Sequence, residues 1–156
     1  MIQNLVFEAG ARGVEDVHPR QMRPAPPDIV LLATEWPTRA LIRAQLIEEG
    51  FEVAAADSWA MMRRHLWPLV KPQLALVDLK GLRNPVDVLN DLRALMKPDR
   101  VLVLRALGTV LETDIERFGY RTVSRPIVIE EIVRAARATI RTATTSQGPP
   151  GGMLCG

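Results

Sequence analysis

The sequence has 156 residues, 47% of them hydrophobic and 24% charged, as is typical of a globular domain built around one core. Two histidines and one cysteine, Cys155, exclude an internal disulfide and argue against a metal site made of His and Cys ligands. The net charge is +2 and the basic residues are scattered along the chain, so nucleic acid is not expected as a direct partner. No apolar run approaches the roughly 18–20 residues that cross a bilayer, so a membrane is not expected as a partner either.

The two ends of the chain differ in composition from its middle. Residues 1–27 end in the proline-rich segment 23–27, which favours a stiff, extended linker. No basic segment precedes an apolar run at the N-terminus, so no signal peptide is predicted and a cytoplasmic protein is expected. Residues 143–156 are rich in glycine and proline and are predicted to form a disordered tail. The folded domain is therefore predicted to span residues 28–142.

The first half of this domain alternates apolar runs with helical patterns. Residues 29–33 are continuously apolar, which predicts a strand covered on both faces. Pro37 then starts a helix that Gly50 ends, because proline suits the first turn of a helix and glycine suits its end. Residues 51–55 predict the second strand, and a second helix follows it until Pro68.

The second half continues the same alternation. The predicted elements are a strand over residues 74–77 that ends at Asp78, a helix over 86–96, a strand over 101–104, a helix over 109–117, a strand over 120–123 and a helix over 127–140. Five strands that alternate with helices predict an α/β fold with a doubly wound, five-stranded parallel sheet. Right-handed crossovers favour the flavodoxin-like strand order 2-1-3-4-5.

Acidic residues follow two strands of this predicted sheet. Glu35 comes directly after the first strand and Asp78 ends the third, and in this topology the carboxyl ends of those strands border the ligand crevice. Two carboxylates that meet there can hold Mg²⁺ through their oxygen atoms. The turn after the first strand has no glycine-rich phosphate loop, which argues against an enzyme that binds a nucleotide or a flavin.

In this arrangement, the sequence over residues 28–142 resembles the receiver domain of bacterial two-component response regulators. The likeness depends on the order and spacing of segments 30–37, 49–53, 72–79 and 124–127. The resemblance implies a receiver topology and a role in phosphorelay signal transduction, as a phosphoprotein and not as an enzyme. By the same likeness, Asp78 is the phosphoacceptor, and Glu35, Asp78 and the backbone carbonyl of Lys80 are the ligands of Mg²⁺.

Several positions depart from the family pattern. Thr34 stands where the first of two paired acids usually lies, and Trp36 occupies a position that is often acidic. Arg105 replaces a small hydroxyl residue, and Arg125 replaces a lysine. The resemblance therefore implies an atypical receiver with a weakened Mg²⁺ site. Because arginine stays charged and binds carboxylates with paired hydrogen bonds, we expect Arg105 or Arg125 to pair with Asp78 and to do part of the work of the metal.

Two functions stay open at this point. In the first, a histidine kinase or phosphotransfer protein donates a phosphoryl group to Asp78. No output domain follows residue 142, so this stand-alone receiver would act through a separate output protein. In the second, the chain is a pseudo-receiver that binds partner proteins independently of phosphorylation. Homodimerisation through the last helix is compatible with both functions.

Overall fold

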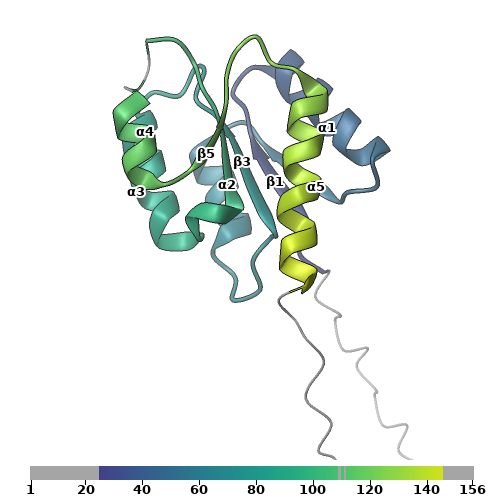
Figure 1. The fold of residues 1–156 in the computed structure, drawn as a ribbon. Coiled ribbons are helices and arrows are strands. Elements are labelled where there is room, and N and C mark those ends of the chain that lie inside the picture. The colour runs from purple at the N-terminus through teal and green to yellow at the C-terminus, as the bar shows by residue number, and fades with distance from the viewer. Residues whose placement is uncertain (1–24, 109, 111, 146–156) are drawn as a thin grey trace, which may run out of the picture.

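The computed structural model describes residues 25–108, 110 and 112–145. Its centre is a five-stranded sheet with the strand order β2-β1-β3-β4-β5, in which all neighbouring strands are parallel (Figure 1). The predicted α/β fold and the predicted strand order 2-1-3-4-5 are confirmed.

Strands and helices alternate along the chain. The strands are β1 (Ile29–Leu32), β2 (Val53–Ala56), β3 (Leu74–Asp78), β4 (Val101–Leu104) and β5 (Arg121–Val123). The helices are α1 (Trp36–Glu48), α2 (Trp59–Leu66), α3 (Pro85–Leu95), α4 (Glu112–Phe118) and α5 (Ile129–Thr145), with a short 3₁₀ turn, η1 (Pro98–Arg100), before β4. No helix within the described part of the chain is both long and apolar enough to cross a bilayer.

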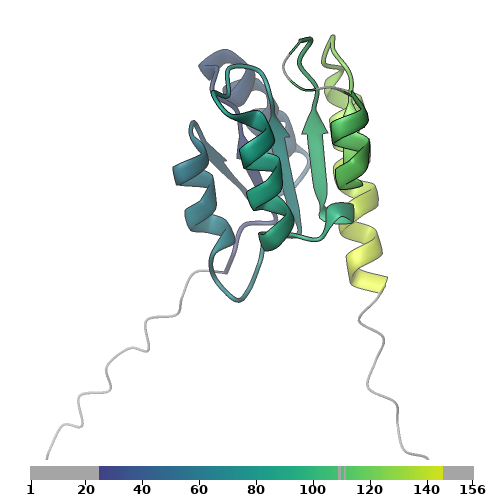
Figure 2. The ribbon, with the colours of Figure 1, turned by 90° about the vertical axis from the view of Figure 1, so that its left-hand side faces the viewer.

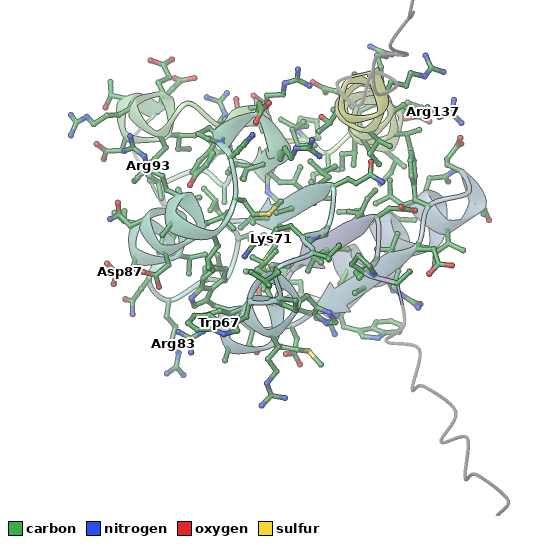
Figure 3. All side chains as sticks on the ribbon, turned by 90° about the horizontal axis from the view of Figure 1, so that it is seen from below. Trp67, Lys71, Arg83, Asp87, Arg93 and Arg137 are labelled. Carbon is green, nitrogen blue, oxygen red and sulfur yellow. The ribbon has the colours of Figure 1, made fainter. Side chains whose placement is uncertain are left out.

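The helices cover both faces of the sheet in two layers. Helices α1 and α5 pack on one face, where Ile42 and Ile132 join a buried cluster with Ile29 and Leu31 of β1. Helices α2, α3 and α4 pack on the other face, which Figure 2 shows with α3 in front of the sheet. Seen from below, Arg137 of α5 lies on one side of the sheet, and Trp67, which follows α2, lies on the other (Figure 3). Both faces of every central strand are therefore buried, which explains the continuous apolar runs.

Some element boundaries differ from the prediction. Strand β2 begins at Val53 rather than at residue 51, because the backbone N–H of Phe51 still bonds to the carbonyl of Leu46 and so belongs to the turn that closes α1. Helix α4 is described from Glu112 to Phe118, and residues 109 and 111 at the predicted start of this helix lie outside the described residues. Helix α5 starts at Ile129 and continues to Thr145, beyond the predicted domain end at residue 142. Most of the predicted N-terminal extension and C-terminal tail (residues 1–24 and 146–156) lies outside the described residues.

The register of the strands brings the predicted site residues to one edge of the sheet. Leu32, the last residue of β1, lies opposite Val77, and Asp78 lies opposite Leu104. Leu104 in turn lies opposite Val123, the last residue of β5. The residues that follow β1, β4 and β5 therefore surround the end of β3, which is where Asp78 lies.

Candidate functional site

The carboxylate of Asp78 is at the centre of this edge, and its side chain is only 1% exposed. Its Oδ1 accepts a hydrogen bond from Nη2 of Arg125 at 2.5 Å and another from the backbone N–H of Lys80 at 3.0 Å. Its Oδ2 is buried and has no hydrogen-bond partner among the described residues. One oxygen of Asp78 is therefore held firmly, while the other has no partner within the described structure.

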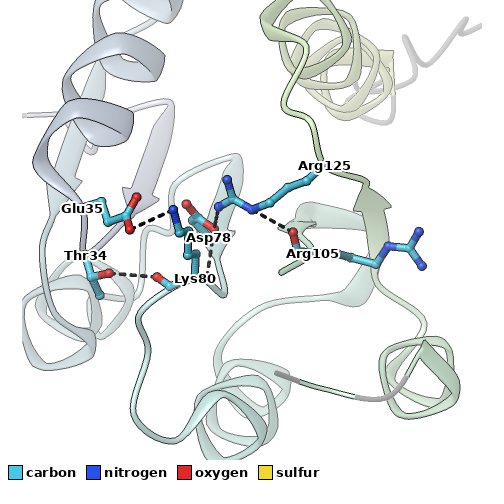
Figure 4. Close-up of polar contacts among 6 residues, drawn as sticks. All are labelled: Thr34, Glu35, Asp78, Lys80, Arg105 and Arg125. Atoms are coloured by element: carbon cyan, nitrogen blue, oxygen red, sulfur yellow. Dashed lines mark hydrogen bonds and ion pairs between the residues drawn. The ribbon is translucent and has the colours of Figure 1, made fainter. Parts of the chain in front are cut away.

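Arg125 lies between Asp78 and the end of β4. Its Nε donates a hydrogen bond to the backbone carbonyl of Arg105 at 3.1 Å, while its Nη2 contacts Asp78 (Figure 4). The flat, forked guanidinium makes both contacts at once, which fixes its orientation. The Arg125 side chain is still 22% exposed, so it can also reach a ligand that enters from solvent.

The side chain of Arg105 does not contact Asp78. Its guanidinium points away from Asp78 (Figure 4). It forms an ion pair with Glu112 of α4 and donates a hydrogen bond to the hydroxyl of Ser124. Only its backbone carbonyl contacts the site, through Arg125. Of the two arginines expected to pair with Asp78, Arg125 makes the contact, and the acid on α4 draws the side chain of Arg105 to another part of the surface.

Glu35 forms an ion pair with Lys80 across the mouth of the pocket. The distance between Oε1 of Glu35 and Nζ of Lys80 is 3.0 Å, and both side chains are roughly half exposed. The backbone N–H of Lys80 bonds to Asp78, as described above. Lys80 thus connects the two acids that the sequence predicts to share one site, although the two carboxylates bind different cationic side chains.

The backbone carbonyl of Lys80, predicted as a metal ligand, also has a partner within the protein. The hydroxyl Oγ1 of Thr34 donates a hydrogen bond to it at 2.8 Å. The next residue, Gly81, has a φ of +79°, and a Cβ atom at this position would lie 2.3 Å from Oγ1 of Thr34. Glycine at position 81 therefore lets the loop after β3 approach the end of β1 closely.

The pocket fits a divalent metal poorly. Oε1 of Glu35, Oδ1 of Asp78 and the carbonyl of Lys80 each have a hydrogen-bond or ion-pair partner already, whereas Oδ2 of Asp78 has none among the described residues. The described ranges contain no group of three or more His, Cys, Asp or Glu residues placed to hold a metal ion. Mg²⁺ requires oxygen ligands in a near-octahedral arrangement, and here two carboxylates face an ammonium and a guanidinium instead.

Two features of this pocket were not predicted from the sequence. Lys80 was expected to contribute only its carbonyl, whereas its ammonium binds Glu35. Thr34 was expected to mark only a lost acid, whereas its hydroxyl anchors the loop after β3. The position of Lys80, two residues after Asp78, was the only sequence signal for the first feature.

Comparison with known proteins identifies the fold. No family model matches the sequence, and no curated protein matches it. A response regulator receiver domain protein from Clostridium thermocellum superposes with a TM-score of 0.64 at 18% identity, over 76% of this chain and 98% of that one. A signal receiver domain from Vibrio parahaemolyticus gives a TM-score of 0.64 at 18% identity, over 78% and 98% of the two chains. An adenylate cyclase from Rhodopirellula baltica gives 0.60 at 21% identity, over 76% and 92%. Likeness at these identities shows a shared fold.

Proposed function

We propose that this chain, which has the fold of response regulator receiver domains, is an atypical receiver in phosphorelay signalling, with Asp78 as its phosphoacceptor. Its proposed partners are a histidine kinase or phosphotransfer protein that supplies the phosphoryl group and a separate protein that carries the output. A homodimer is compatible with this role.

The observation that supports this proposal is the uneven environment of the Asp78 carboxylate. A buried polar atom without a partner is uncommon and calls for a functional explanation. Here Oδ2 is such an atom, while Oδ1 is held by Arg125 and by the backbone of Lys80. This arrangement orients the carboxylate and leaves Oδ2 without a hydrogen bond that would have to break before it acts as a nucleophile.

The proposed chemistry needs no redox step. Oδ2 of Asp78 attacks the phosphorus of the donor, a new O–P bond forms, and the bond between phosphorus and the donor group breaks with its electron pair leaving on the donor. The product is an acyl phosphate on Asp78. The guanidinium of Arg125, which lies 2.5 Å from Oδ1, would offset the negative charge on the phosphoryl oxygens of this acyl phosphate. A receiver fold implies Mg²⁺ at this place, but the poor fit of the pocket gives the metal no step here.

A second candidate function, the pseudo-receiver, is favoured by a different observation. The Asp78 side chain is 1% exposed and its charge is already balanced by Arg125. A donor must therefore move covering residues before it reaches Oδ2. If that movement does not occur, the chain acts through protein contacts alone.

Intact-mass measurement with a small phosphodonor distinguishes the two functions. The full chain is incubated with acetyl phosphate, with and without Mg²⁺, and then weighed. We expect one added phosphate on the wild type and none on Asp78→Asn. The matched control Asp87→Asn changes an exposed acid on α3 and should still be labelled. Labelling of Asp78→Asn would contradict the assigned residue, and no labelling of the wild type with any donor would favour the pseudo-receiver.

A further inference from the structure

We propose that the side chain of Lys80 is a built-in cation that replaces the divalent metal at the acidic end of the sheet. This inference rests on the proposed function for what the pocket does, but the replacement itself concerns only charge and geometry. Arg125 is the cation bound to Asp78, and Lys80 is a second cation, bound to Glu35. If Lys80 replaces the metal, a substitution at Lys80 should change how the site binds metal ions.

The charges of the pocket balance without a metal. Arg125 is paired with Asp78, and Lys80 is paired with Glu35 at 3.0 Å. Each carboxylate thus has its own cation within direct contact. A divalent ion that entered would add positive charge beside an ammonium and a guanidinium, and like charges at such short range repel strongly. At Glu35 it would compete with the ammonium of Lys80.

Two hydrogen bonds of the Lys80 backbone position its side chain beside Glu35. Its N–H donates to Oδ1 of Asp78 at 3.0 Å, and its carbonyl accepts from the hydroxyl of Thr34 at 2.8 Å. Both polar groups of this peptide segment are therefore anchored to the ends of β1 and β3. From this fixed point the side chain extends toward Glu35 (Figure 4).

Stability alone does not account for this ion pair. Both side chains are about half exposed, at 49% for Lys80 and 41% for Glu35, and ion pairs at such exposure contribute little to the free energy of folding. An ammonium is, however, a mobile point charge with three donors, and it binds phosphate oxygens readily. Lys80 can therefore neutralise Glu35 in the resting pocket and turn to a phosphoryl group once Asp78 carries one.

Direct binding of Mn²⁺ tests the replacement without any phosphorylation. Mn²⁺ is titrated into the full chain, and free ion is followed by its electron paramagnetic resonance signal. We expect weak binding to the wild type and an affinity higher by about tenfold or more in Lys80→Met, because Glu35 is then free to act as a charged ligand. Lys97→Met, which changes an exposed lysine, is the matched control and should bind Mn²⁺ as weakly as the wild type does.

Two further variants make the result specific. Lys80→Met combined with Glu35→Gln should lose the gained affinity, which would locate the ion at Glu35. Lys80→Gln repeats the measurement if circular dichroism shows that Lys80→Met is not folded. Equal Mn²⁺ affinity in the wild type and in the folded Lys80 variants would overturn the inference. This outcome is separate from the failure of phosphotransfer, because a chain that acetyl phosphate never labels can still gain Mn²⁺ binding when Lys80 is replaced.

Discussion

Among the described residues, Arg125 is the one charged side chain that contacts the carboxylate of Asp78, so a substitution at either residue should affect stability. Asp78 is almost fully buried, whereas Arg125 keeps 22% of its side chain exposed. A buried ion pair adds little net stability as a pair, because both charges lose water when they are buried. Removal of one partner is costly, because the remaining charge stays buried alone.

We therefore expect Arg125→Ala to lower the free energy of unfolding by about 2 kcal/mol, less than the ~3–5 kcal/mol that is typical of a fully buried pair, because Arg125 is partly exposed. Urea unfolding measures this change. Arg64→Ala, which changes an exposed arginine on α2, is the control and should have almost no effect. In the Asp78→Asn background the cost of Arg125→Ala should shrink, because no charge is left unpaired; an unchanged cost would show that Arg125 stabilises the fold in another way.

At the scale of elements, the loop after β3 is attached to the end of β1 by one side chain. Thr34 bonds to the carbonyl of Lys80, and Gly81 lies so close to Thr34 that no Cβ fits between them without a shift. This contact determines where Lys80 stands relative to both acids. The geometry of the pocket therefore depends on a glycine that carries no chemistry of its own.

The substitution Gly81→Ala should destabilise the protein by about 2–3 kcal/mol, since it combines strain at positive φ with a steric clash. Gly50→Ala is the matched control, because Gly50 also has a positive φ, of +92°, but no atom of the described residues lies within 4 Å of an added Cβ. It should cost only about 1 kcal/mol. Denaturant unfolding of both variants, and of Gly81→Ala with Thr34→Ala, separates the two contributions. Equal costs at positions 81 and 50 would argue against the clash.

At the scale of the whole molecule, Tyr120, which directly precedes the edge strand β5, connects that strand with the layer of helices on one face. Its hydroxyl donates a hydrogen bond to the carbonyl of Leu89 in α3 at 2.6 Å, and its ring stacks on Phe118 of α4 with centroids 5.5 Å apart. Burial of the side chain raises the pKa of Tyr120 to about 12, although the positive charge of Arg93, labelled in Figure 3, acts in the opposite direction.

This raised pKa predicts that stability falls at alkaline pH. The folded state keeps its proton up to about 12, whereas the unfolded chain releases it near the ordinary value of 10.0. The stabilising contribution is therefore complete below pH 10.0 and is lost as the pH rises towards about 12. Urea unfolding across this window should show a steeper decline for the wild type than for Tyr120→Phe, which has no proton to lose. Parallel curves would show that Tyr120 ionises equally in both states.

Much of the fold could be predicted because its signals are local. The continuous apolar runs at β1 and β3 indicated strands covered on both faces, and the order of elements then left few topologies. Which helical residues are buried was harder to predict. Leu41 and Ile47 continue the apolar pattern of α1, yet they are 60% and 44% exposed, because the sheet covers only a narrow stripe that includes Ile42 and Leu46.

That Glu35 and Asp78 follow strands whose carboxyl ends share one edge could be predicted from the amino-acid sequence, because the position of a residue after a strand is a property of the local chain. Which cations contact the two acids depends on contacts between distant elements. Arg105 and Arg125 look equivalent along the chain, but Glu112 on another element draws Arg105 away, and the loop held by Thr34 directs Lys80 to Glu35. The direction of a long side chain depends on partners that lie far away in the sequence, so no local pattern records it.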